Sequence, residues 1–244
     1  MAATVILRSP ATNRQIHPKN ANPTGAAIDH AVRLIHAICR LAGSASLIND
    51  IRADLRADKV QAAIRNRDTG PVFDDVADGD LVGWIDRQLA TANSPPGPER
   101  LARMRGSLIG PLREVYGLSD KVLTMALSCI LLGAPTGKAL WAEVGGSMIA
   151  IDTLVHNFLH RTGILARFKA SHAYGTACYR SGNCAEIIDA IADRIDARQF
   201  NASYPQPFPR FVQHAIWRYC SQTGLDVCNG NRMGSGCGLS ISIN

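Results

Sequence analysis

Long apolar runs are what this sequence most clearly lacks. No window of its 244 residues reaches the roughly 18 consecutive apolar residues of a membrane-spanning helix, at the N-terminus or elsewhere. We therefore expect a soluble protein with no membrane partner, located in the cytoplasm (with the nucleoid in a bacterium or archaeon) or in a eukaryotic nucleus. A repeat of fixed period is lacking too, which excludes a repeat array.

A secreted disulfide framework is also absent. The seven cysteines are odd in number and unevenly spread between Cys39 and Cys237. Two pairs, Cys178 with Cys184 and Cys220 with Cys228, could converge on zinc, although neither has the short gap usual for zinc sites. The alternative is that these thiols are buried packing residues, which leaves no metal or other cofactor.

Strand patterns are nearly missing, since only residues 3–7 and 239–243 have a β-type composition. Apolar residues instead recur at steps of three and four, and Gly or Pro separates the runs. The sequence therefore predicts an all-α fold: an N-terminal arm over 1–24, a helical domain over 25–228 and a tail over 229–244. The expected helices cover residues 26–43, 46–65, 78–92, 99–115, 120–132, 151–161, 184–198 and 209–221.

A formal charge of +6 and a pI of about 9.1 suit a polyanionic partner, but many basic proteins never meet nucleic acid. Four arginines precede residue 115 and are candidates for phosphate contacts, although a solvated helix face explains them equally well. They are Arg100, Arg103, Arg105 and Arg113.

The most informative stretch is a tight turn over residues 115–121, which leads from one helix to Lys121 at the start of the next. Together, residues 106–132 predict a helix-hairpin-helix unit. The turn leaves backbone N–H groups free at a helix N-terminus, where they can bind a DNA phosphate without reading sequence. A second stretch, Ile149 to Thr153, places the lone carboxylate of Asp152 among apolar residues at another helix start.

These two stretches resemble the helix-hairpin-helix DNA glycosylases, the family that includes endonuclease III and 8-oxoguanine DNA glycosylase. The family's hairpin reads Leu-Pro-Gly-Val-Gly-x-Lys, and this chain keeps the glycine at Gly117 and the lysine at Lys121, with Ser119 in place of the second glycine. The family's second motif reads Val-Asp-Thr-His, and this chain has Ile-Asp-Thr-Leu around Asp152. The resemblance implies a two-lobed helical fold with a cleft between the lobes.

By this resemblance Lys121 is the nucleophile and Asp152 the essential carboxylate. A neutral lysine attacks C1′ of the sugar, expels the base and forms a Schiff base, from which β-elimination cuts the strand. Asp152 stabilises the cationic sugar and aids proton transfer. The alternative for Lys121 is a solvated surface lysine, and the alternative for Asp152 is an ordinary N-cap.

A flipped base needs an aromatic platform and a polar group for its edge. In the 8-oxoguanine glycosylases a C-terminal helix carries a glutamine and an aromatic residue four positions apart, and here Gln213 and Trp217 have that spacing. We expect Gln213 to read the base edge, Trp217 to stack on it and Met125 to form the opposite wall. Otherwise Trp217 is a core residue and Gln213 a surface amide.

His156 lies on one helical stripe with Asp152 and His160, which permits a metal site. We expect it instead to contact the DNA backbone, together with Gly117 and Ser119. The close cysteine spacing of an endonuclease III iron–sulfur cluster is missing.

The sequence therefore predicts an enzyme of base excision repair that acts on double-stranded DNA as a monomer. We expect it to be a glycosylase and AP lyase for an oxidised purine, with 8-oxoguanine as the first candidate. Three alternatives stay open: an oxidised-pyrimidine enzyme, a monofunctional glycosylase in which Asp152 activates water, and a non-catalytic helix-hairpin-helix DNA-binding protein.

Overall fold

A computed structural model of the chain describes residues 25–56, 76–114, 118–135 and 137–221. Within these ranges the fold is all-α, as predicted, and contains no strand. The expected arm, the tail and both β-type segments lie outside the described residues, as do Gly117 and Cys228. The principal helices are α1 (Gly25–Ala42), α2 (Leu47–Arg56), α4 (Leu81–Ala92), α5 (Arg100–Arg113), α6 (Asp120–Gly133), α7 (Ala139–Ser147), α8 (Thr153–Arg161), α10 (Cys184–Ala192) and α11 (Pro209–Cys220).

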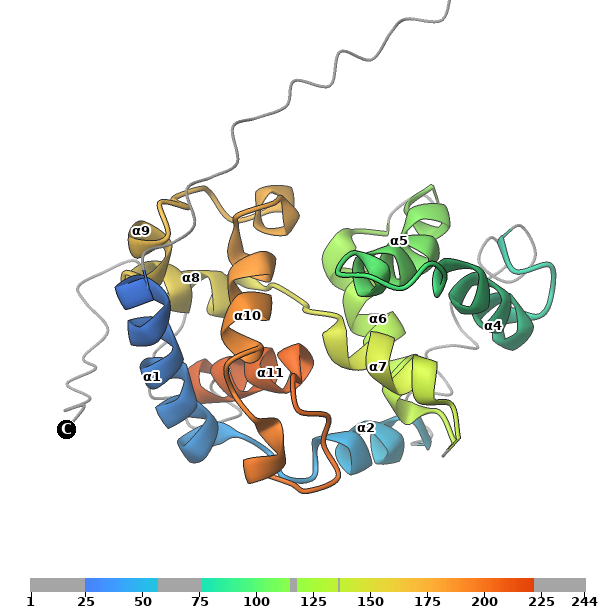
Figure 1. The fold of residues 1–244 in the computed structure, drawn as a ribbon, viewed down its shortest axis with the longest axis horizontal. Helices are drawn as coiled ribbons and strands as arrows, with labels where there is room; N and C mark the ends of the chain where they lie inside the picture. Colours follow the sequence, from blue (N-terminus) through green and yellow to red (C-terminus); the bar gives the residue numbers. More distant parts are fainter. Residues whose placement is uncertain (1–24, 57–75, 115–117, 136, 222–244) are drawn as a thin grey trace, which may run out of the picture.

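The helices bury their apolar faces in two hydrophobic cores. One core joins α1, α8, α10 and α11 with the first half of α2, and the other joins α4, α5, α6 and α7. Figure 1 shows the first group around α11 and the second around α6. Helix α6 contributes to both cores, because Leu131 belongs to the second and Leu132 to the first.

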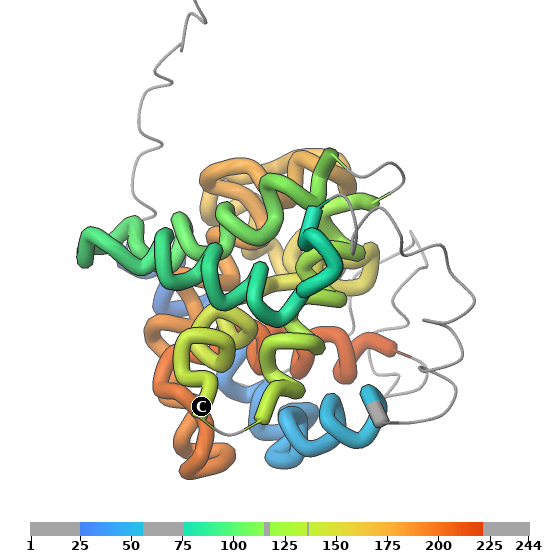
Figure 2. Tube along the Cα trace, turned by 90° about the vertical axis from the view of Figure 1, so that its right-hand side faces the viewer, coloured from blue at the N-terminus to red at the C-terminus, as the bar shows by residue number. Residues whose placement is uncertain are grey.

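The segment between α7 and α8 crosses from one group to the other (Figure 1). Its first residue, Met148, is buried in the second core, whereas Ile149 and Ile151 are buried in the first. Figure 2 views the molecule from the side of the second group, so that α4 and α5 lie in front of the first group. Asp152 therefore starts α8 directly after the chain has passed between the two cores.

Two predictions about helix boundaries were wrong. The expected helix over 184–198 ends at Ala192, and a short 3-10 helix, η3 (Ala197–Gln199), follows. Asp196 caps this second helix, because its carboxylate accepts a hydrogen bond from the backbone N–H of Arg198 at 3.1 Å. The stretch over 133–146, expected to be a connection, instead contains α7.

Among the described helices, none is by itself long and apolar enough to cross a membrane, and α1 with α2 meets that test only as a pair bent by 57°.

Candidate functional site

Lys121 lies in the first turn of α6, where the sequence predicted it. Ser119 caps this helix, and its hydroxyl oxygen accepts the backbone N–H of Val122 at 3.4 Å. Ser119 is thus the N-cap of α6, and its contact with DNA stays a prediction. Lys121 is half-buried, and it makes no ion pair with another described residue.

Asp152 is the N-cap of α8. Its carboxylate accepts the backbone N–H of Val155 at 2.9 Å, and the side chain remains half-buried. The cap uses only one carboxylate oxygen, so the second oxygen can still accept a hydrogen bond. Asp152 also affects Tyr174. Burial raises the pKa of the Tyr174 phenol, and the negative charge of Asp152 raises that pKa further.

Tyr179 connects the starts of α6 and α8. Its phenol oxygen accepts the backbone N–H of Ile151, the residue before Asp152, at 2.9 Å. The phenol lines the same cleft as Thr124, which lies one turn after Lys121. Burial raises the pKa of Tyr179 to about 12, so the phenol keeps its proton at neutral pH.

Arg210, in the first turn of α11, is a buried cation between the two groups of helices. It is 8 % exposed, and its guanidinium donates a hydrogen bond to the amide oxygen of Gln213. A further hydrogen bond joins it to Cys129, on the Lys121 face of α6 two turns further along. Burial lowers the pKa of Arg210, and the charges of Cys129 and Asp152 oppose that shift. Arg210 therefore links the Lys121 face of α6 electrostatically to the start of α8.

The three residues predicted to hold a base have different surroundings. Gln213 is 4 % exposed, and its carbonyl oxygen is already engaged by Arg210. Trp217 packs at the edge of the first core, and its ring stacks on His214 with centroids 5.7 Å apart. Met125 is 42 % exposed on α6, one turn beyond Lys121. The contacts of Arg210 bring Gln213, but not Trp217, into the neighbourhood of Asp152.

A cleft of about 780 Å³ lies between the two groups of helices. It is lined by α5 and α6 on one side and by α10 and the 3-10 helix η2 (Thr176–Tyr179) on the other, and it includes Thr124, Ile149 and Tyr179. Arg105 and Asp189 form an ion pair at 3.5 Å among its lining residues. The cleft is of mixed charge and reaches the first turns of α6.

The four arginines expected to contact phosphate all have partners within the protein. Arg100 pairs with Glu143 at 2.6 Å, and Arg113 pairs with Asp120 at 2.6 Å. Arg105 contacts Asp189, and Arg103 donates to the carbonyl of Pro95. These contacts favour the helix-face explanation over the phosphate-binding one.

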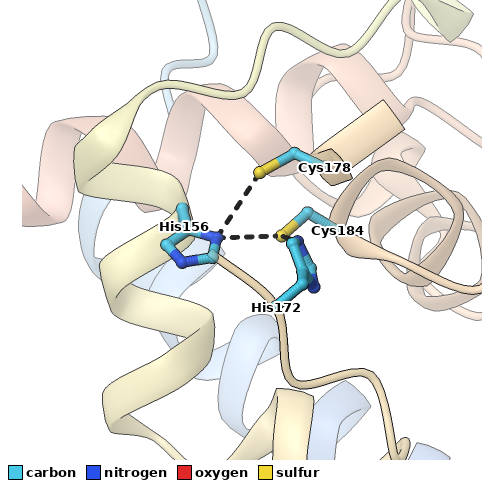
Figure 3. A group of neighbouring side chains, drawn as sticks. All are labelled: His156, His172, Cys178 and Cys184. Carbon is cyan, nitrogen blue, oxygen red and sulfur yellow. Dashed lines mark hydrogen bonds between the residues drawn. The ribbon is translucent and has the colours of Figure 1, made fainter. Parts of the chain in front are cut away.

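The densest group of metal-ligating side chains lies one turn beyond Asp152. Two histidines and two cysteines converge there from α8, a loop, η2 and α10, and their ligand atoms all lie within 4.8 Å of one another: His156, His172, Cys178 and Cys184 (Figure 3). His156 Nδ1 is 3.4 Å from Cys184 Sγ and 3.5 Å from Cys178 Sγ. Cys184 Sγ is 3.3 Å from His172 Nε2. These four residues could bind a metal ion.

Two predictions are corrected by this cluster. His156 was expected to contact the DNA backbone, but it is 5 % exposed and faces the two cysteines. Of the four cysteines proposed as zinc ligands, only Cys178 and Cys184 belong to the cluster. Cys220 is buried in the first core and Cys228 lies outside the described residues. Sequence reasoning missed His172, whose only signal is its place ahead of two evenly spaced cysteines.

The two thiols interact strongly. The hydrogen bond from Cys184, more than any other cause, lowers the pKa of Cys178 to about 5, and the same contact raises the pKa of Cys184. Backbone near Gly175 and the ring of His172 also lower the pKa of Cys178.

Comparisons of the chain with protein-family models, with curated proteins and with solved structures find no match.

Proposed function

We propose that this protein is a DNA glycosylase and AP lyase that removes an oxidised purine, with 8-oxoguanine as the first candidate, from double-stranded DNA. Lys121 is the proposed nucleophile and Asp152 the proposed carboxylate. The observation that carries the proposal is the position of Tyr179: its phenol accepts the backbone N–H directly before Asp152, and it lines the same cleft as Thr124, in the helix that Lys121 opens.

The order and capping of the helices support this assignment. Helix α5 ends at Arg113, shortly before the predicted hairpin, α6 begins one residue before Lys121, and α8 begins one residue after Asp152. Lys121 has no counter-ion among the described residues, so its amine is not held away from a substrate. The phosphate-anchoring role of Gly117 stays a prediction, since this residue lies outside the described ranges.

The chemistry requires one covalent intermediate. The neutral Nζ of Lys121 attacks C1′ of the damaged nucleotide, and the bond between C1′ and the base nitrogen breaks with its electron pair going to the base, which is then protonated. The sugar ring opens to an imine on Lys121, and loss of a C2′ proton expels the 3′ phosphate by β-elimination. The negative charge of Asp152 stabilises the positive charge that develops on the sugar.

Borohydride trapping tests the proposal directly. The full chain is incubated with duplexes carrying 8-oxoguanine opposite cytosine, an abasic site, or no lesion, because borohydride reduces the imine to a stable covalent adduct. We expect a lesion-dependent adduct with the wild type, loss of that adduct in Lys121→Gln, and its retention in Lys138→Gln. Lys138 is a matched control because it lies beyond the other end of α6, paired with Asp86.

Other outcomes separate the alternatives. An adduct on the abasic duplex alone would keep the lyase and redirect the search to oxidised pyrimidines or other bases. Base release without an adduct would favour the monofunctional enzyme in which Asp152 activates water. DNA binding with no chemistry on any duplex would overturn the enzymatic proposal in favour of a DNA-binding protein.

A further inference from the structure

The cluster of His156, His172, Cys178 and Cys184 has the shape of a tetrahedral zinc site. A zinc ion with bonds of about 2.3 Å to sulfur and about 2.0 Å to nitrogen places neighbouring sulfur and nitrogen ligands about 3.5 Å apart. Three sulfur–nitrogen separations in the cluster are 3.3, 3.4 and 3.5 Å, and all four ligand atoms lie within 4.8 Å of one another. These three separations match the spacing that a zinc ion requires.

The imidazole of His172 is held in the form that binds metal. Its Nδ1 lies 2.5 Å from the backbone oxygen of Ala170. A carbonyl oxygen can only accept, so Nδ1 carries the proton and Nε2 presents its lone pair to Cys184. Metal-binding histidines generally donate their second ring nitrogen to a carbonyl or carboxylate in this way.

The loop that carries the ligands is shaped to bring them together. His172 follows the short helix α9 (Ile164–Arg167), Cys178 lies in η2, and Cys184 opens α10. Gly175 and Gly182 flank the Cys178 turn with φ values of 141° and 80°, a backbone conformation that favours glycine. The turn therefore returns Cys178 and Cys184 to the face of α8 that bears His156.

We propose that His156, His172, Cys178 and Cys184 bind one structural zinc ion. Two thiolates and two imidazoles suit zinc, and four protein ligands leave no open position for a substrate. Three of the ligands are buried and His172 is half-buried, as expected for a site closed to solvent. Each cysteine loses its thiol proton when it binds the ion.

The ion would tie residues 168–184 to α8. That stretch contains only the short helix η2, so it has few backbone hydrogen bonds of its own to fix its path. Cys178 is also the neighbour of Tyr179, whose phenol holds the backbone before Asp152. The zinc site thus braces the start of α8 from two sides, through His156 and through Tyr179. This inference rests on the cluster alone and does not depend on the proposed activity.

Metal analysis of the full, tag-free chain tests the proposal. We expect about one zinc per chain in protein purified without chelator, and less than a tenth of that in the Cys178→Ser, Cys184→Ser double variant. The matched control is Cys39→Ser with Cys129→Ser, because these two thiols lie in α1 and α6, outside the cluster. The control should keep its zinc.

A second measurement uses only the wild-type chain, in case the double variant does not fold. Zinc is removed with a chelator and replaced by Co²⁺, which gives intense visible absorption and thiolate charge-transfer bands in a tetrahedral site. We expect both signals to saturate at one Co²⁺ per chain and to disappear when Zn²⁺ is added back.

Three results would overturn the proposal. The first is a wild-type chain that binds neither zinc nor Co²⁺ and shows a Cys178–Cys184 disulfide by mass spectrometry. The second is iron in place of zinc. The third is zinc that persists in the Cys178, Cys184 double variant but is lost in the Cys39, Cys129 control.

Discussion

The phenol oxygen of Tyr179 accepts the backbone N–H of Ile151 at 2.9 Å, so a residue of the zinc-site loop fixes the chain directly before Asp152. Ile151 is 1 % exposed, and water has no ready access to replace this bond. The contact joins the two features that define the molecule: the capped start of α8 and the His/Cys cluster beside it.

Tyr179→Phe should remove this contact while keeping the ring. We expect a loss of about 1–3 kcal/mol in the free energy of unfolding, because a buried N–H is left without an acceptor. If the proposed function holds, the single-turnover rate on the 8-oxoguanine duplex should also fall about tenfold with little change in DNA affinity, since Asp152 is misplaced rather than removed. Urea unfolding and single-turnover kinetics measure the two effects.

Tyr174→Phe is the matched control for this substitution. Tyr174 is 42 % exposed, and the backbone N–H of Ile151 binds Tyr179 rather than the Tyr174 hydroxyl. It should therefore change both quantities little. Equal effects from the two substitutions would contradict the bracing role assigned to Tyr179.

Replacing Asp152 by asparagine and by alanine separates its two roles. Asparagine still caps a helix, so Asp152→Asn should cost only a few tenths of a kcal/mol of stability, whereas Asp152→Ala should cost about 1 kcal/mol. Both remove the carboxylate, and both should abolish base release if Asp152 is catalytic. Full activity in Asp152→Asn would leave the residue as an N-cap only.

The sequence was sufficient to predict the capped helices that position the proposed site. The helices that begin at Asp120 and directly after Asp152 lie within two residues of where the sequence placed them. Ser119 and Asp152 are both strong N-cap residue types, but the cap was predicted only for Asp152, as the alternative to its catalytic role. Helix α7 was missed because Gly145 and Gly146 lower its helix propensity. It forms because those glycines let α7 pack closely on its neighbours, a tertiary effect that local patterns do not carry.

Only two of the four ligands of the metal cluster, Cys178 and Cys184, were predicted from the sequence as zinc ligands, again because tertiary structure brings the ligands together. Its ligands are separated by 15, 5 and 5 residues, whereas a recognisable zinc motif brings two ligands within two to four residues. His156 comes from a helix and His172 from a loop, so only the folded chain brings them to Cys178 and Cys184. Two of the arginines before residue 115 misled for the same reason, because Arg100 and Arg105 pair with Glu143 and Asp189, which are distant in sequence.

His214 should make stability depend on pH. Burial, followed by the charges of Arg210 and Arg218, lowers the pKa of this histidine to about 4, while Asp50 opposes the shift. In the unfolded chain its pKa is about 6.5. The neutral ring therefore stabilises the fold fully above pH 6.5, and this contribution is lost as the pH falls toward 4.

Unfolding free energies at pH 7 and pH 4.5 check this expectation. The wild type should lose up to about 2–3 kcal/mol more than His214→Gln between these two values, since glutamine cannot take up the proton. The comparison cancels the other groups that titrate in both proteins, including the cysteines and histidines of the cluster. Parallel losses in the two proteins would show that His214 is not the group responsible.

Two glycine substitutions should have opposite effects and thereby test the packing of α7 on α6. A Cβ added at Gly145 would lie 2.7 Å from the Cβ of Leu131 and 3.2 Å from the backbone nitrogen of Leu132. Neither atom belongs to a flexible side-chain end, so Gly145→Ala should push the helices apart and cost about 1–3 kcal/mol.

Gly106, in the interior of α5, has nothing within 4 Å of the same added atom. Gly106→Ala should therefore stabilise the protein by about 0.5–1 kcal/mol, because alanine loses less backbone entropy in a helix. Urea unfolding of both variants measures the pair under one set of conditions. A stabilising effect of Gly145→Ala would mean that α7 does not pack closely against α6. The packing of α7 would then not hold in place the segment that leads from α7 to Asp152 between the two cores.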